Sequence, residues 1–314
     1  MTQVQETKEI FNKIMDEMKK RIVGNENVIE LMFASLLSGG HVLLEGVPGV
    51  AKTLMASTLA EVIKVGFKRI QFTSDLMPAD ITGGNIYERE TSSFNFIEGP
   101  VFTNVLLTDE INRAPPKTQS ALLEAMQEKQ VSSGKKTYKL PEPFMVIATQ
   151  NPIESTGVYP LPEAQIDRFL VKIPVYPPSL QGEIAMLVKK KEEMFADVNA
   201  VTKKDTLKKL ASEIENGVIL SNQILEYIAK LVVATRSVPS FALGASPRGS
   251  IALLTLSRSI AAIRGRDFVE PDDIKAIFFP VMNHRLILSP EAEIEQIRVS
   301  EIIQNVLSEV EVVI

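Results

Sequence analysis

The feature that most constrains this chain is a glycine-rich turn between an apolar run and a helical pattern. The run His41–Glu45 leads into the turn Gly46-Val47-Pro48-Gly49-Val50-Ala51, and Lys52 and Thr53 then open the helical stretch Leu54–Ala60. A strand, a turn and a helix N-terminus in this order direct several backbone N–H groups at one point, where phosphate groups bind. The pattern therefore predicts a phosphate loop, in which Lys52 adds a mobile charge and the Thr53 hydroxyl is placed to ligate Mg²⁺.

Ala51 departs from the usual phosphate-loop pattern, which has glycine immediately before the lysine. A methyl group is tolerable at this position if the backbone there is already helical, and we expect that conformation for Ala51. The alternative interpretation is an ordinary strand-turn-helix crossover in which the Lys-Thr pair occurs by chance. A second motif is needed to decide between the two.

That second motif lies downstream, where the apolar run Val105–Thr108 ends in two adjacent carboxylates, Asp109 and Glu110. Ligands of parallel sheets collect beyond the carboxyl ends of the strands, so we expect these acids at the same edge as the phosphate loop. Asp109 would hold the Mg²⁺ shell, mostly through water, and Glu110 would polarise a water in line with the terminal phosphate. The alternative, a charge pair at a helix N-terminus, is disfavoured by the presence of both motifs in order.

Strand and helix patterns alternate as far as about Pro178 and are mostly helical beyond it. This rhythm predicts an α/β protein, a three-layer α/β sandwich with a parallel sheet, followed by a smaller all-α domain. The proline-rich segment Pro174–Pro178 indicates a hinge, so we place the two domains at residues 1–177 and 178–314. The expected strands are His41–Glu45, Lys68–Thr73, Asn104–Thr108, Phe144–Thr149 and Phe169–Ile173.

Helices are expected between the strands of the first domain, including Pro116–Lys129, and six more are expected after the hinge. Two segments interrupt the first domain: Ser74–Pro100, rich in glycine and aromatics, and Gln130–Pro143, where Ser132–Lys136 is typical of a hairpin tip. The expected helices are Pro116–Lys129, Ser179–Phe195, Thr206–Asn216, Ser221–Ser237, Arg248–Gly265, Pro271–His284 and Pro290–Val310.

Length and composition limit the class of protein further. The 314 residues suggest two domains, and the hydrophobic content of 45% is ordinary for a soluble globular protein. No run approaches the roughly 18 apolar residues of a spanning helix, and the first residues lack signal-peptide features, so we expect a cytoplasmic protein without membrane insertion. The net charge of −5 disfavours nucleic acid as the main partner.

The types of metal site are limited by the same composition. The chain has no cysteine, which excludes disulfides, thiolate metal sites and cysteine nucleophiles. It has only two histidines, which disfavour a histidine-based metal site. We therefore expect Mg²⁺, arriving with a nucleotide, to be the metal.

Several motifs taken together resemble the MoxR family of AAA+ ATPases, and the resemblance spans nearly the whole chain. It implies an AAA+ core that binds ATP and Mg²⁺, a helical lid, and an alanine at position 51 as a normal feature. The motifs are Glu45–Thr53, Asp109–Gln119, Ala148–Pro152, Tyr159–Gln165, Asp167–Leu170 and Gly244–Arg248.

The resemblance also implies roles for three further residues. Asn151 resembles the sensor 1 residue, whose amide holds the attacking water and the γ-phosphate together; the alternative is a turn asparagine before a proline. Arg168 resembles the arginine finger, which stabilises charge at a neighbouring subunit's γ-phosphate; the alternative is a solvated charge at the rim. Arg248 resembles sensor 2, and the subunit that it serves stays open because related subgroups differ in this respect.

The candidate site residues are assigned to adenine packing, catalysis, metal binding and ATP binding. Val23 and Gly24 resemble the segment that packs on adenine, the alternative being an ordinary turn after the first helix. Glu110, Asn151, Arg168 and Arg248 are assigned to catalysis, and Thr53 and Asp109 to the metal. The residues assigned to ATP binding are Val23, Gly24, Gly46, Val47, Pro48, Gly49, Val50, Ala51, Lys52, Thr53, Leu54 and Asp109.

The function implied is Mg²⁺-dependent hydrolysis of ATP to ADP and phosphate by a homo-oligomeric ring, a hexamer by resemblance. Such a ring would act as a chaperone-like factor in maturation or cofactor insertion of a protein client, with von Willebrand factor A domain partners. The two interrupting segments would line its pore, and Phe94 and Phe96 would grip the client; the alternative for these two is ordinary packing of alternating aromatics in a short strand. The alternatives are a chelatase-type motor for metal insertion, a nucleic-acid translocase, which the acidic charge disfavours, and a non-catalytic nucleotide-gated scaffold.

Overall fold

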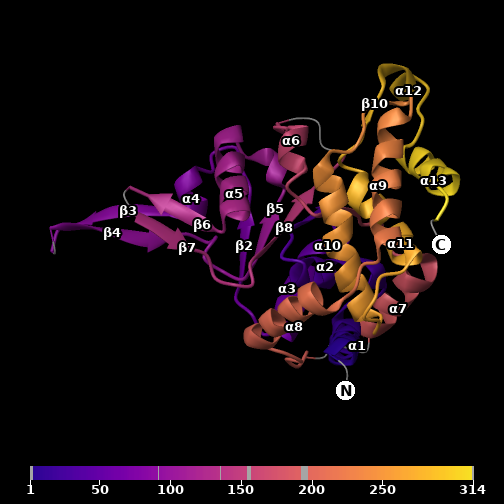
Figure 1. The fold of residues 1–314 in the computed structure, drawn as a ribbon. Coiled ribbons are helices and arrows are strands. Elements are labelled where there is room, and N and C mark those ends of the chain that lie inside the picture. Colours follow the sequence, from indigo (N-terminus) through magenta and orange to yellow (C-terminus); the bar gives the residue numbers. More distant parts are fainter. Residues whose placement is uncertain (1–2, 91, 135, 154–156, 192–196, 313–314) are drawn as a thin grey trace.

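A five-stranded sheet forms the centre of the computed structural model, which describes residues 3–90, 92–134, 136–153, 157–191 and 197–312 (Figure 1). The strands lie in the order β2-β5-β8-β1-β9, and every neighbouring pair is parallel. All five expected strands are present, with ends shifted by one or two residues. They are β1 (Val42–Glu45), β2 (Phe67–Gln71), β5 (Val105–Asp109), β8 (Met145–Gln150) and β9 (Val171–Pro174).

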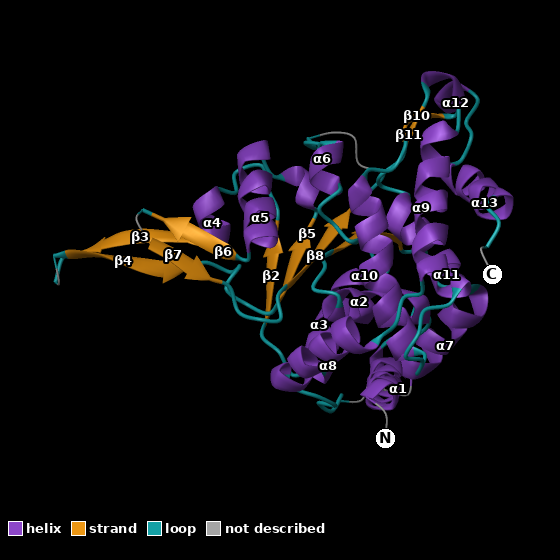
Figure 2. Ribbon diagram, in the orientation of Figure 1, coloured by secondary structure: helices purple, strands orange, loops and turns teal. Residues whose placement is uncertain are grey.

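Alternate side chains of these strands enter two separate apolar clusters, because successive residues of a strand point to opposite faces. In β1, Val42 and Leu44 belong to one cluster and Leu43 to the other. Helices cover both faces, so the core is the three-layer sandwich that the alternating pattern predicted (Figure 2). One cluster contains residues of α1 (Gln3–Arg21), α2 (Glu26–Leu37) and α3 (Lys52–Val62), and the other contains residues of α4 (Pro78–Thr82) and α5 (Pro116–Glu128).

The register of the sheet brings the ends of four strands to one edge. β1 and β8 are paired so that Glu45 lies opposite Gln150, and β2 and β5 so that Gln71 lies opposite Asp109. The turn after β1 and the polar residues that end β5 and β8 therefore emerge together. A short 3-10 helix, η1 (Ile111–Arg113), follows β5.

Two antiparallel hairpins occupy the segments that interrupt the core pattern. β3 (Gly83–Glu88) pairs with β4 (Ser93–Glu98), and β6 (Gln130–Ser133) pairs with β7 (Lys136–Lys139). They project together from the sheet, on the left of Figure 1.

The chain beyond β9 is mainly helical, which confirms the expected fold class of an α/β core followed by a helical lid. A two-stranded pair, β10 (Phe241–Leu243) with β11 (Ile287–Leu288), is an addition that the sequence pattern did not predict. The described helices of this half are α7 (Leu180–Lys191), α8 (Lys204–Gly217), α9 (Asn222–Ser237), α10 (Pro247–Ile263), α11 (Pro271–Met282), α12 (Pro290–Ile294) and α13 (Val299–Glu309). The short helix α6 (Glu163–Ile166) lies before β9.

Two of the expected helices differ from the structure. The stretch Pro290–Val310, expected as one helix, forms α12 and α13, because Gln296 between them has a positive φ of 56° that no right-handed helix accommodates. The end of the expected helix Ser179–Phe195 lies outside the described residues, which stop at Lys191 and resume at Asp197. Among the described helices, none is both long and apolar enough to cross a lipid bilayer.

The helical half packs directly on the sheet domain. One apolar cluster runs without interruption from α1, α2 and α3 into α8, α9, α10 and α11. After α11, three consecutive residues bind backbone carbonyl groups of the core: Asn283 binds that of Lys172, His284 that of Phe169, and Arg285 that of Leu170. The segment between α6 and β9 is therefore fixed by the lid as well as by the sheet.

Candidate active site

The turn after β1 has the geometry expected of a phosphate loop. A Cβ at Gly46 would clash with the carbonyl oxygen of Val175, so the backbone there passes too close for a side chain. Gly49 is required for a different reason, a positive φ of 88°. α3 starts at Lys52, whose ammonium group donates to the carbonyl oxygen of Gly46. The free amides of α3 and the positive end of its dipole thus lie beside the lysine.

Ala51 does not have the helical conformation that we expected. It is the N-cap of α3, with φ 60° and ψ 21° in the left-handed region. A residue with a Cβ is less stable there than glycine by about 1 kcal/mol. The methyl group itself is exposed, so the departure from glycine is accommodated by open space rather than by a helical backbone.

Asp109 lies at the centre of the polar contacts at this edge, and it is 6% exposed. Its Oδ2 accepts from the Thr53 hydroxyl at 3.4 Å and from Arg69 Nε at 2.6 Å. Its Oδ1 accepts from the Thr149 hydroxyl at 3.2 Å. The structure therefore brings the two predicted metal ligands, Thr53 and Asp109, within direct contact of each other.

Two neighbouring side chains bind the carboxylate of Glu110. Its Oε2 accepts from Gln71 Nε2 at 2.7 Å and pairs with Arg113 Nε at 2.9 Å. Its backbone has a positive φ of 57°, and its N–H donates to the Thr149 hydroxyl at 2.9 Å. Such a strained, hydrogen-bonded conformation at a strand end is typical of functional sites.

Asn151 follows β8 and is 6% exposed. Its Oδ1 accepts from the backbone N–H of Ile153 at 3.2 Å, which is the turn contact that we gave as the alternative to a sensor. No described residue binds its amide nitrogen, which can therefore bind a ligand. The turn contact and the sensor role are thus compatible, because they use different atoms of one side chain.

One cavity of about 360 Å³ collects most of the predicted site. It contains the loop, both carboxylates and Asn151 from three different strand ends. Four of the predicted ATP-binding residues are outside its lining: Val23 and Gly24, in the turn between α1 and α2, and Gly46 and Val47, at the start of the loop. The lining residues are Pro48, Gly49, Val50, Ala51, Lys52, Thr53, Leu54, Arg69, Gln71, Asp109, Glu110, Thr149 and Asn151.

Arg168 and Arg248 lie elsewhere. Both line a separate cavity of about 420 Å³ between the core and α10. Arg248 Nη1 is 3.5 Å from Asp167 Oδ2, and Arg168 is the next residue along the chain. The structure thus groups the two predicted arginines with each other and not with the phosphate loop.

The comparisons with known proteins agree with this geometry. A family model described as "ATPase family associated with various cellular activities (AAA)" matches residues 41–171, and one described as an AAA lid domain matches residues 233–306. The protein named Chaperone MoxR1 of Mycobacterium tuberculosis is 46% identical over 303 residues, which cover 94% of this chain and 80% of that protein. This chain belongs to the MoxR family of AAA+ ATPases.

Two further similarities extend over nearly the full length of this MoxR-family chain. YeaC of Bacillus subtilis, a protein of uncharacterised function, is 45% identical over 304 residues, which cover 96% of this chain and 95% of that protein. A crystal structure of a candidate ATPase from Cytophaga hutchinsonii superposes with a TM-score of 0.92 at 41% identity, covering 99% of this chain and 97% of that one. The AAA+ core and lid are therefore shared along the whole chain.

Four polar residues of the MoxR-family site were missed at the sequence level. Arg69 and Gln71 are on β2, Arg113 is in η1 and Thr149 is the last residue but one of β8. All four contact Asp109 or Glu110. The alternation in β2 was a usable signal, because Arg69 and Gln71 share one face of a strand that ends at the predicted site edge.

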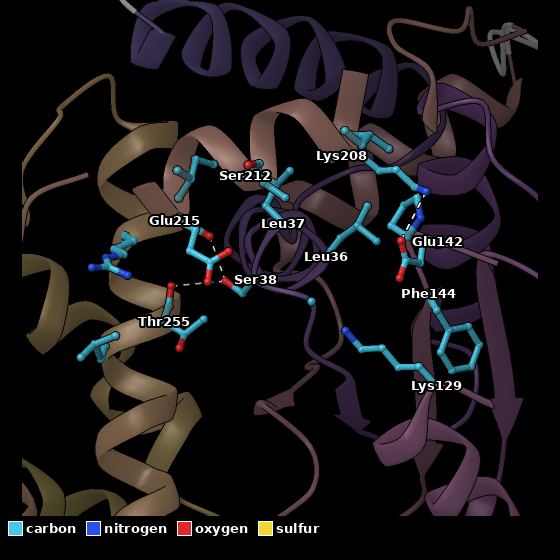
Figure 3. Close-up of a pocket in the computed structure, with 18 residues that line it drawn as sticks. Leu36, Leu37, Ser38, Lys129, Glu142, Phe144, Lys208, Ser212, Glu215 and Thr255 are labelled. Carbon is cyan, nitrogen blue, oxygen red and sulfur yellow. Dashed lines mark hydrogen bonds and ion pairs between the residues drawn. The ribbon is translucent and has the colours of Figure 1, made fainter. Parts of the chain in front are cut away.

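The larger cavities do not coincide with this site. A cavity of about 590 Å³ lies between the end of α2, α8 and α10, where Ser38, Lys129 and Thr255 are on its walls (Figure 3). It contains none of the predicted residues, and it shares Ser38, Lys129 and Thr255 with the cavity of Arg168 and Arg248. Cavity size alone would therefore have pointed away from the phosphate loop.

Proposed function

We propose that this MoxR-family chain hydrolyses ATP to ADP and phosphate with Mg²⁺. The observation that carries the proposal is the single cavity that holds the phosphate loop, Asp109, Glu110 and Asn151. The residues fit Mg²⁺, because Thr53 and Asp109 present hard oxygen atoms 3.4 Å apart, and this ion takes one or two protein ligands with water and phosphate for the rest. Lys52 and the amides of α3 would bind the β- and γ-phosphates.

Glu110 would act as the base that orients and polarises the attacking water. Its carboxylate is bound by Gln71 and Arg113 in this structure, so these contacts must exchange for a water before hydrolysis. Asn151, on the neighbouring strand end, would hold that water against the γ-phosphate. Both groups act by positioning and polarisation, which supply most of the rate in phosphoryl transfer.

Arg168 and Arg248 would serve the nucleotide of a neighbouring subunit. They line a different cavity from the phosphate loop, and the Arg248 side chain is 55% exposed. Because one face of a subunit then completes the site on another face, the interface is head-to-tail, and such interfaces form rings where the rotation between subunits closes. We propose a homo-oligomeric ring of six subunits, the number implied by the resemblance.

The client and the setting belong to the same proposal. We place the AAA+ core at residues 1–177 and the lid at residues 178–314, in the cytoplasm. A relative bears the name Chaperone MoxR1, and this chain carries a projecting hairpin with exposed Tyr87 and Phe94. These support a chaperone-like role. From the family resemblance we further propose maturation or cofactor insertion of a protein client, with von Willebrand factor A domain proteins as partners.

Glu110→Gln tests the hydrolytic site. The variant should bind a fluorescent ATP analogue as the unchanged protein does, and its turnover should fall by at least about 100-fold, the usual contribution of a general base. Lys52→Ala should lose binding itself, and Glu124→Gln on the exposed face of α5 is the matched control. Turnover of Glu110→Gln at the unchanged rate would remove Glu110 from the mechanism.

The ring is tested by measuring specific ATPase activity against protein concentration, with sizing in ATP and in ADP. Shared sites predict activity that rises steeply as a large assembly forms. A constant specific activity from a monomer would contradict the role of Arg168 in a neighbouring site and leave the phosphate loop unaffected.

A further inference from the structure

Asp167 connects the lid to the two arginines through both of its carboxylate oxygens. Oδ1 accepts from Arg285 Nε at 2.7 Å. Oδ2 accepts from the Ser246 hydroxyl at 3.4 Å and lies 3.5 Å from Arg248 Nη1. One side chain between α6 and β9 thus binds the segment after α11 and the first turn of α10 at the same time.

Arg285 is the buried partner in this arrangement, with a side chain that is 3% exposed. Besides the Asp167 carboxylate, its guanidinium donates to the backbone carbonyls of Asp167 at 3.3 Å, Phe169 at 2.7 Å and Leu170 at 3.2 Å. It also donates to the carbonyl of Val281, near the end of α11. A planar guanidinium makes such forked contacts, whereas a lysine ammonium cannot reproduce them.

Arg168 lies inside the segment that Arg285 holds, between Asp167 and Phe169. Its Nε is buried and has no hydrogen-bond partner among the described residues, so this atom is available to a group from outside the chain. Its cavity is lined by four cations and one carboxylate, Lys129, Arg168, Arg248, Arg285 and Asp167. The excess of positive charge suits a phosphate group that arrives from outside the chain.

We propose that Asp167 is a positioning residue, which uses its buried pair with Arg285 to hold Arg168 and Arg248 as one unit and to couple their position to the lid. This inference rests on the proposed action of both arginines at a neighbouring subunit's nucleotide. Movement of the lid shifts Arg285 and the start of α10 together, and Asp167 transmits that shift to Arg168. Asp167 itself contacts no substrate.

Asp167→Asn is the decisive variant, because it keeps the shape of the side chain while removing its charge. The protein should bind a fluorescent ATP analogue with a dissociation constant within about twofold of the unchanged value, since the phosphate loop is in another cavity. Its kcat should fall by about tenfold or more, with little change in KM, because the arginines are no longer held together. Asp205→Asn, an exposed carboxylate at the start of α8, is the matched control.

Mixing subunits separates positioning from folding. Lys52→Ala subunits cannot bind ATP and retain intact arginines, so they should restore activity to Asp167→Asn subunits in a mixed ring. When the two variants are mixed in equal amounts and assemble at random, about one interface in four has an intact phosphate loop on one side and intact arginines on the other. The ATPase activity of the mixture should therefore reach about a quarter of that of the unchanged ring. Arg168→Ala mixed with Lys52→Ala provides the reference for that recovery.

The outcomes distinguish this inference from the proposed function. Recovery in both mixtures supports the role of Asp167. Recovery with Arg168→Ala and none with Asp167→Asn overturns the inference and leaves the proposed function standing, and so does an unchanged kcat in Asp167→Asn. No recovery in either mixture overturns the inference together with the proposed action of the arginines at a neighbouring subunit, and it leaves the phosphate loop unaffected. Should Asp167→Asn fail to bind nucleotide, Arg285→Lys decides by the same mixing assay, because it keeps the charge and loses the fork.

Discussion

Arg69 competes for the carboxylate that the proposed metal site needs. Its Nε lies 2.6 Å from Asp109 Oδ2, the same oxygen that contacts the Thr53 hydroxyl. The Arg69 side chain is 52% exposed, so solvent screens the pair and its contribution is about 1 kcal/mol or less. Binding of a cation at Thr53 and Asp109 therefore requires displacement of a weak, replaceable partner.

Replacing Arg69 by alanine should make the site easier to fill. We expect the Mg²⁺ concentration that half-saturates binding of a fluorescent ATP analogue to fall by about two- to fivefold, because the competing guanidinium is gone. Arg69→Lys, which retains the charge without the planar fork, should lie between the two. An unchanged or higher Mg²⁺ requirement in Arg69→Ala would show that Arg69 assists binding instead of opposing it.

The residues of the site divide into those that local sequence reveals and those that it does not. The phosphate loop, Asp109 and Glu110 were predictable because each follows an apolar run that ends at a strand terminus. Arg69 was not, because its contact with Asp109 depends on how β2 pairs with β5 in the sheet. Arg285 was missed for the same reason, since 118 residues separate it from Asp167.

At the scale of elements, all five strands were predictable from apolar runs, and the principal errors were at single backbone angles. Ala51 has a positive φ where we expected a helical one, and Gln296 divides an expected helix in the same way. Neither residue is glycine, so composition gave no sign of the left-handed conformation. The hairpins were recognised as interruptions, whereas their mutual packing depends on contacts between distant segments.

That packing separates the two phenylalanines that we expected to act together. Phe96 stacks on Tyr138 of the other hairpin, with ring centroids 4.0 Å apart and planes at 14°, and it also contacts Phe102 at 5.7 Å. Phe94 is 70% exposed and contacts only Tyr87 among the described rings, at 5.2 Å. The expectation of an exposed grip residue thus suits Phe94, while Phe96 joins β4 to β7.

Tyr138→Ala should loosen the β3–β4 hairpin without unfolding the core. The lost stack is worth about 0.5–1.5 kcal/mol beyond its buried area, and the hydrogen bond from Asn85 to Ser133 still joins the hairpins. We expect faster amide hydrogen exchange in residues 83–98, with unchanged exchange in the sheet. Phe94→Ala is the control and should leave that exchange unchanged; equal protection in Tyr138→Ala would show that the stack does not hold the hairpins.

At the scale of the whole molecule, two buried histidines fasten distant parts of the fold in their neutral form. His41 accepts from the N–H of Val146 through Nδ1 and contacts the carbonyl of Met126 through Nε2 at 3.1 Å, joining β1, β8 and α5. Burial and the nearby Lys129 together lower the pKa of His41 to about 4, although the hydrogen bond to Met126 acts in the opposite direction. Burial and the neighbouring Arg285 likewise lower the pKa of His284, which fastens the lid to Phe169.

These shifts predict how the free energy of unfolding depends on pH. A histidine in the unfolded chain has a pKa near 6.5. Below that pH the two histidines are therefore protonated in the unfolded chain while they stay neutral in the folded chain. Stability should therefore be constant above about pH 7 and fall as the pH drops from 6.5 toward 4. The pKa of His41 alone corresponds to a loss of about 2 kcal/mol between pH 7.5 and pH 5, and His284 adds a loss in the same direction.

Urea unfolding at pH 7.5, 6 and 5 measures this dependence, and His41→Gln isolates one contribution. A glutamine amide can donate to Met126 and accept from Val146 without titrating. Because it fits the site less well than histidine, the variant should be less stable at pH 7.5. Its free energy of unfolding should, however, decrease less as the pH is lowered. The difference between the variant and the unchanged protein should shrink by about 2 kcal/mol at pH 5. An identical pH dependence in both proteins would mean that His41 titrates normally in the fold, and its role as a neutral link between the strands would have to be abandoned.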